Sequence, residues 1–128
     1  AYTPGMEMSG GSLGLGLSIA GGKAMGLKRK GSDSRVYVLF SDGELDEGSV
    51  WEAIMAAAHH RLDNIIAVVD VNNQQPDDPS TQVMGFEPLV DRLEAFGWYT
   101  QRVDGNDLDA VVKAFDAARE HGEVKPRM

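Results

Sequence analysis

The stretch "RVYVLFSDGELDEG", residues 35–48, joins an apolar run to a crowded group of acids. Residues 36–40 are β-branched, aromatic or aliphatic without alternating polarity, which is typical of a strand covered on both faces. Four acids follow within six positions: Asp42, Glu44, Asp46 and Glu47. Negative charge concentrated directly after a buried strand indicates one of two things, an exposed acidic turn or a cation site.

A second apolar run, "IIAVVDV" at residues 65–71, predicts another strand covered on both faces. Between the two runs, "VWEAIMAAAHH" predicts a helix to His60, and Ser49 with Glu52 match an S-x-x-E capping box at its start. Apolar spacing and β-propensity predict the remaining elements, which are helices at 12–30, 87–97 and within 104–122 and a third strand at 98–103. Helices that alternate with strands predict an α/β fold, with a parallel sheet, right-handed crossovers and helices on both faces.

Oxygen-bearing side chains follow the first two predicted strands at the point where each ends. Asp42 comes directly after the first strand, and Asn72 follows the second. In parallel α/β sheets ligands bind beyond the carboxyl ends of the strands, so these side chains are expected to converge if the strands are neighbours. Carboxylate and amide oxygens suit Mg²⁺, which keeps phosphate or water oxygens in its remaining positions. The residues alone leave a metal–phosphate site and a solvated acidic turn both open.

Composition excludes several classes of function. The net charge is −8, from 20 acids against 12 bases, which argues against non-specific binding of nucleic acid. The chain has no cysteine, so it carries neither a disulfide framework nor a thiolate site, and this fits a reducing cytoplasm. No apolar run approaches the ~20 residues of a membrane span, and the start lacks the features of a signal peptide. We expect a cytoplasmic protein that binds neither nucleic acid nor membrane.

The 128 residues suffice for one compact domain. The chain begins with Ala rather than Met and finishes on "EVKPRM", which resembles the start of a strand. We therefore expect residues 1–128 to be a single domain, truncated at both ends.

Residues 41–75, "SDGELDEGSVWEAIMAAAHHRLDNIIAVVDVNNQQ", resemble the thiamine-diphosphate motif of the transketolase family. That motif is G-D-G, about thirty residues, and an Asn after an apolar strand; here Asp42 and Asn72 stand thirty positions apart. The segments "SGGSLGLGLSIAGGKAMGLK" and "EPLVDRLEAFGWYTQRVDGNDL" are similar to family segments before and after the motif. Three segments in the family's order identify the chain as transketolase-like, with the thiamine-diphosphate-binding fold as the implied architecture. The resemblance implies that residues 1–128 are a single thiamine-diphosphate/Mg²⁺-binding domain, truncated at both ends.

The resemblance implies roles for individual residues. Asp42 and Asn72 match side-chain ligands of Mg²⁺, and Gln74 matches a residue that gives the metal its backbone carbonyl. Gly43 matches a glycine at the diphosphate of the cofactor, and Ser41 stands where the family has the first glycine of the motif.

Further roles concern the other end of the cofactor and the dimer. Gly11 and Leu13 match main-chain contacts to the aminopyrimidine ring. Glu47 matches an acid near the two-fold axis, between the two cofactors of the dimer, and is the candidate catalytic residue. Besides Ser41, the chain departs from the family at Leu15, where a Gln is usual.

The function that the resemblance implies is transfer of a two-carbon ketol unit between sugar phosphates with thiamine diphosphate and Mg²⁺. The implied partners are a sugar-phosphate substrate and a pyrimidine-binding domain in the same or another chain, within a homodimer or a heterotetramer. Alternatives are another thiamine-diphosphate enzyme, such as a deoxyxylulose-phosphate synthase, or a non-catalytic, degenerate cofactor-binding subunit. A third class is an acidic Mg²⁺-binding domain of the phosphate-receiver kind, which needs no thiamine diphosphate.

Overall fold

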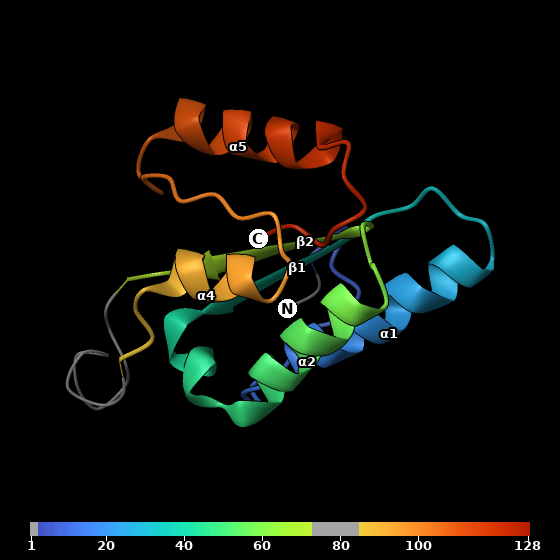
Figure 1. Ribbon diagram of the computed structural model, residues 1–128, viewed down its shortest axis with the longest axis horizontal. Coiled ribbons are helices and arrows are strands. Elements are labelled where there is room, and N and C mark those ends of the chain that lie inside the picture. Colours follow the sequence, from blue (N-terminus) through green and yellow to red (C-terminus); the bar gives the residue numbers. More distant parts are fainter. Residues whose placement is uncertain (1–2, 73–84) are drawn as a thin grey trace.

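A computed structural model describes residues 3–72 and 85–128, and its centre is a parallel pair of strands. Strand β1, Val36–Ser41, pairs with β2, Ile65–Asp70, in a register that runs from Val36 opposite Ile65 to Ser41 opposite Asp70. Both apolar runs form the expected strands, and their carboxyl ends lie at the same edge of the sheet (Figure 1). The prediction that both faces are covered is wrong for β1, because Tyr37 and Leu39 on one face are 51% and 72% exposed. The confirmed architecture is mixed α/β around this two-stranded parallel sheet.

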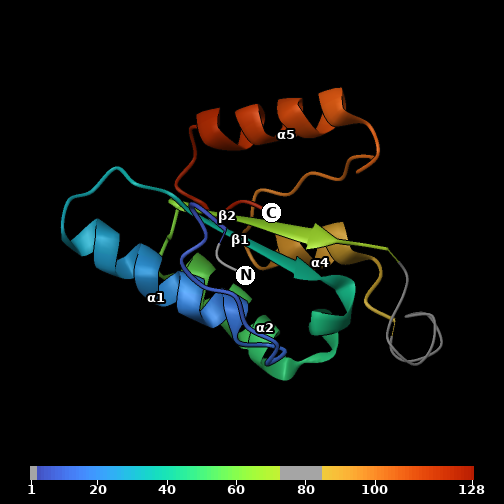
Figure 2. The same ribbon diagram turned by 180° about the vertical axis from the view of Figure 1, so that it is seen from behind.

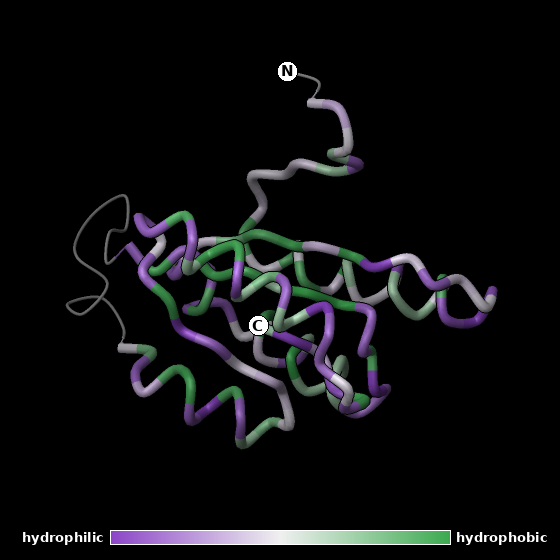
Figure 3. Tube along the Cα trace, turned by 90° about the horizontal axis from the view of Figure 1, so that it is seen from above, coloured by the Kyte–Doolittle hydropathy of each residue, from purple (hydrophilic) through white to green (hydrophobic). Residues whose placement is uncertain are grey.

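Helices α1, Gly16–Arg29, and α2, Gly48–His59, pack on the sheet and on each other. They bury Leu17, Ala24 and Ile54 against Phe40 and other core residues. Helix α5, Leu108–Glu120, lies on the opposite side of the strands (Figure 2), where the Phe115 ring contacts Tyr37 of β1. Figure 3 shows the apolar chain concentrated along the centre of the molecule, and the N-terminal segment leaving it. In the part of the chain that the structure describes, no helix has the length and apolarity needed to cross a membrane.

The helix predicted from Ser12 begins later, at Gly16. The preceding turn contains Gly14 with φ +83°, a left-handed conformation that a helix cannot include. The predicted capping box is also wrong: α2 begins at Gly48, its N-cap Glu47 makes no side-chain capping bond, and Ser49 lies inside the helix. The hydroxyl of Ser49 instead donates to the Gly14 carbonyl, a partner 35 residues away that local sequence cannot reveal.

The third predicted strand, 98–103, does not form as a regular strand. Only Tyr99 makes a bridge, and its partner is Arg127, which also bridges Ile66 of β2. The segment therefore reaches the sheet through the residues around Arg127, which lie between it and β2. The β-propensity of residues 98–103 predicted a strand here, but the pairing depends on residues far along the chain.

The helix predicted over 87–97 is shorter, since α4 spans Leu89–Ala95. Pro88 is its N-cap residue, and Gly97 follows its end with φ +91°. The acidic stretch, expected as a loop, forms a short 3-10 helix, η1, over Asp42–Asp46.

Candidate functional site

Asp42 is the first residue after β1, and its side chain is fully buried at 0% exposure. Its neighbour Ser41 pairs with Asp70, and Asn72 follows two residues beyond that partner. The ladder therefore brings Asp42 and Asn72 to the same edge of the sheet, as the strand order required. Asn72 is exposed, and its Nδ2 donates to Asp70 Oδ2 at 3.3 Å. That bond uses the amide nitrogen whereas a metal would use the amide oxygen, so one side chain can serve both.

The solvated-turn interpretation fails for the residues that matter most. Asp42 and Leu45 of η1 are buried, and the Trp51 indole Nε1 donates to the Leu45 carbonyl at 2.7 Å. This bond fixes the turn to the first part of α2. A carboxylate taken out of water in this way needs compensation from bonded groups or from a cation. Glu47, by contrast, is exposed beside the N-terminus of α2.

The donor chemistry of this edge fits Mg²⁺, because Asp42 and Asn72 both offer hard oxygen atoms. Within residues 3–72 and 85–128, no group of three or more His, Cys, Asp or Glu side chains could hold a metal ion. A site here would thus combine one carboxylate with amide, carbonyl and ligand oxygens. Gln74, the predicted source of a carbonyl, lies outside the described residues.

The turn before α1 is joined to the acidic turn through Gly14. The Gly14 amide donates to Glu44 Oε2 at 3.1 Å, and its carbonyl accepts from Ser49 Oγ at 3.0 Å. The predicted cofactor contacts Gly11 and Leu13 are exposed and stand just before this junction. These two hydrogen bonds therefore join the Gly11–Leu13 stretch to the acidic turn that contains Asp42. Glu44, which is part of this junction, carries no signal for it in the sequence.

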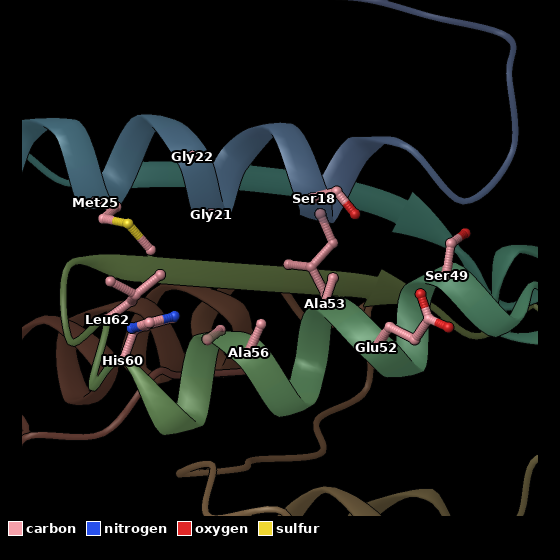
Figure 4. Close-up of a pocket in the computed structure, with 12 residues that line it drawn as sticks. Ser18, Gly21, Gly22, Met25, Ser49, Glu52, Ala53, Ala56, His60 and Leu62 are labelled. Carbon is pink, nitrogen blue, oxygen red and sulfur yellow. The ribbon is translucent and has the colours of Figure 1, made fainter.

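Two hollows flank the sheet. One, of about 320 Å³, lies between α1 and α2 and is lined mainly by small residues, with Ser49 and Glu52 toward one end and His60 toward the other (Figure 4). None of the predicted cofactor residues lines it. The second, of about 850 Å³, lies between β2, α4 and α5 and includes Asn72 among its lining residues. Neither hollow is evident from the sequence, because each is lined by residues from several elements.

The sequence model of one family, described as "Transketolase, thiamine diphosphate binding domain", matches residues 1–128. The chain belongs to this family. It is 64% identical over all of its 128 residues to an uncharacterized transketolase family protein, y4mO, of Sinorhizobium fredii, covering 46% of that protein. It is 40% identical over 126 residues, 98% of this chain, to the 6-deoxy-6-sulfo-D-fructose transketolase subunit SqwG of a Clostridium species, again covering 46% of that subunit.

A similar relation holds for a solved structure. Transketolase from Campylobacter jejuni superposes with a TM-score of 0.88 at 32% identity, over 96% of this chain and 20% of the Campylobacter chain. The chain thus spans about half the length of the curated relatives above and a smaller share of that transketolase. The family predicted from the three sequence segments is confirmed. The fold is confirmed as mixed α/β with a two-stranded parallel sheet that superposes on a transketolase.

Proposed function

We propose that this chain is the diphosphate-binding part of a transketolase that transfers a two-carbon ketol unit between sugar phosphates. The family match over the whole chain supports this, as does similarity to a protein named as a transketolase subunit. The single structural observation that carries the proposal is the buried carboxylate of Asp42, set at the carboxyl end of β1 beside the end of β2.

In this proposal Asp42 and Asn72 hold Mg²⁺ with the Gln74 carbonyl, and Ser41 and Gly43 lie at the diphosphate. The backbone of Gly11 and Leu13 contacts the aminopyrimidine ring. When bound, thiamine diphosphate supplies the electron sink that lets a carbon–carbon bond next to a carbonyl break. The residues of this chain contribute anchoring, because they fix the charged end of the cofactor and leave its ring to face a second domain.

The proposed partner is a pyrimidine-binding domain in the same or another chain, within a homodimer or a heterotetramer. Glu47 is exposed at the end of the acidic turn and has room to meet a neighbouring subunit, which suits its proposed place near a dimer axis. The proposed compartment is the cytoplasm.

Ser41 and Leu15 favour one alternative, a non-catalytic subunit. Leu15 is 47% exposed at the start of α1, where the family's Gln would be a polar group near the cofactor. Ser41 is half-buried at the end of β1, where a side chain would crowd the diphosphate or donate to it. Turnover of a pentulose phosphate by the complex with its partner domain separates the alternatives, because a non-catalytic subunit would bind thiamine diphosphate without turnover.

The experiment that tests the proposal is Asp42→Asn in the full-length protein with its partner domain. The amide keeps the shape of the side chain and removes its charge, so the fold should persist. The affinity for thiamine diphosphate in the presence of Mg²⁺, measured by calorimetry, should fall by about 100-fold or more, since even residues behind metal ligands contribute 10–100-fold. Asp33→Asn, in the exposed loop before β1, is the matched control and should bind as wild type.

Wild-type affinity in a folded Asp42→Asn variant would refute the anchoring role. Binding of Mg²⁺ by the wild-type protein without any binding of thiamine diphosphate would instead favour the phosphate-receiver alternative.

A further inference from the structure

Gly14 is the point where the N-terminal segment meets the acidic turn. Residues 3–13 are exposed, whereas Gly14 is buried. Both of its backbone polar groups bond to side chains of the other segment, the amide to Glu44 and the carbonyl to Ser49. A further tie is the surface ion pair between Glu7 and Lys23 of α1, and exposed ion pairs contribute little. Gly14 is therefore the firm anchor of this segment among the described residues.

The space around Gly14 leaves no room for a side chain at this position. A Cβ on Gly14 would collide with the Ser49 hydroxyl and lie 3.0 Å from Glu47 Cβ, and the φ of +83° disfavours any residue but glycine. The glycine thus lets the backbone approach η1 and α2 closely enough for both hydrogen bonds. The Glu44 bond is the stronger of the two, since a carboxylate acceptor makes a charge-assisted hydrogen bond.

We infer that Glu44 and Ser49 are positioning residues, which clamp Gly14 and so fix the Gly11–Leu13 backbone relative to the Asp42 turn. This inference rests on the proposed function and deepens it. One rigid unit then holds both ends of the cofactor: the turn after β1 holds the diphosphate, and the clamped segment holds the ring. Neither residue touches the cofactor; each acts through Gly14.

If the clamp fixes the Gly11–Leu13 backbone, its loss should weaken binding of the ring end of the cofactor and leave binding of the diphosphate end unchanged. In the full-length protein with its partner domain, Glu44→Ala should weaken thiamine diphosphate by about tenfold at saturating Mg²⁺, the change expected for one hydrogen bond to a charged group. Inorganic pyrophosphate with Mg²⁺ probes the anchoring turn alone, and its affinity should stay within about twofold of wild type. A general loss of structure would lower both affinities together.

Matched variants isolate the hydrogen bond. Glu44→Gln keeps an acceptor oxygen and should recover most of the affinity, whereas Ser49→Ala removes the weaker bond and should have a smaller effect in the same direction. Glu94→Ala makes the same chemical change on the exposed side of α4 and should match wild type. Amide hydrogen exchange at Gly14 reads the clamp directly, and it should be faster in Glu44→Ala than in Glu94→Ala.

Each result decides between support and failure. Faster exchange at Gly14 with unchanged affinity for thiamine diphosphate overturns the positioning role, as does an equal loss of affinity for both ligands. Unchanged exchange in Glu44→Ala overturns the clamp itself. If the wild-type protein binds no thiamine diphosphate while its Gly14 amide is protected from exchange, the proposed function is refuted and the clamp is not. The positioning role is then refuted as well, because it rests on the proposed function.

Discussion

Two buried charges lie at opposite ends of the sheet, and their surroundings differ. Asp42 follows the carboxyl end of β1, in a turn that lies beside Asn72. Arg127 sits near the amino end of β2, at 5% exposure, and burial lowers the pKa of its guanidinium. Its two terminal nitrogens donate to four backbone carbonyls, those of Asp63, His121, Glu123 and Lys125.

The difference teaches how to interpret a buried charge. Arg127 is enclosed by carbonyls of the loops it joins, so its charge serves the connection between the end of α5 and the start of β2. Asp42 is at the edge where parallel sheets bind ligands. Burial alone does not separate a structural charge from a functional one; the end of the sheet on which it lies does.

The largest expected effect on stability concerns Arg127, the buried charge with a structural role. Arg127→Met should lower the free energy of unfolding by about 3 kcal/mol, because several buried carbonyls lose their donor at once. The affinity of the folded fraction for thiamine diphosphate should not change. Denaturant unfolding and calorimetry on the full-length protein measure the two quantities, with the exposed Arg29→Met as control. A large loss of affinity without a loss of stability would contradict the structural role of Arg127 and indicate a role in cofactor binding.

Two tryptophans give a matched pair of intermediate size. Trp98 is 2% exposed and donates to the Ile54 carbonyl at 3.0 Å, whereas the half-buried Trp51 donates to Leu45 in the acidic turn. Trp98→Phe should lower stability by about 2 kcal/mol through a cavity and a lost hydrogen bond. Trp51→Phe should lower it by about 1 kcal/mol, yet weaken cofactor binding more. Equal losses of affinity in the two variants would contradict the assignment of the acidic turn to the site.

The smallest expected effect concerns an exposed carboxylate. The Leu89 amide and Arg102 hold the pKa of Glu87 below its usual 4.5. A lowered pKa stabilises the fold at pH above 4.5, and the contribution is lost as pH falls through the folded-state value. Glu87→Gln should therefore lower the free energy of unfolding at pH 7 by less than about 1 kcal/mol, which appears as a slightly lower Tm. The Tm difference from wild type should shrink near pH 3; a difference that stays constant would show that the charge is not responsible.

Sequence predicted the central elements well because their signals are local. The runs "VYVLF" and "IIAVVD" carry their own β-propensity, and the polar residues after them indicated the edge of the sheet at which Asp42 and Asn72 lie. The third strand failed for a non-local reason, since Tyr99 pairs with Arg127 and not with β2.

The site was predictable to a similar limit. The order of the strands predicted that Asp42 and Asn72 lie at one edge of the sheet. The hydrogen-bond partners of the residues around them were not evident from the sequence. Ser49 matched a capping box, and the structure gives its hydroxyl to Gly14 instead. Nothing in the sequence signals that Gly14 takes a positive φ or that Glu44 accepts from its amide.

The position of Arg127 between Ile66 and Tyr99 has a consequence for the order of assembly. On the ribosome, the stretch near Tyr99 emerges well before the residues that must sit between it and β2. Until Pro126–Met128 arrive, the amides of Tyr99 and Gln101 lack the carbonyls that they bond in the finished sheet. Because Arg127 also bonds to Ile65 and Ala67 of β2, the segment near Tyr99 can join the sheet only after residues 126–128 have been synthesised.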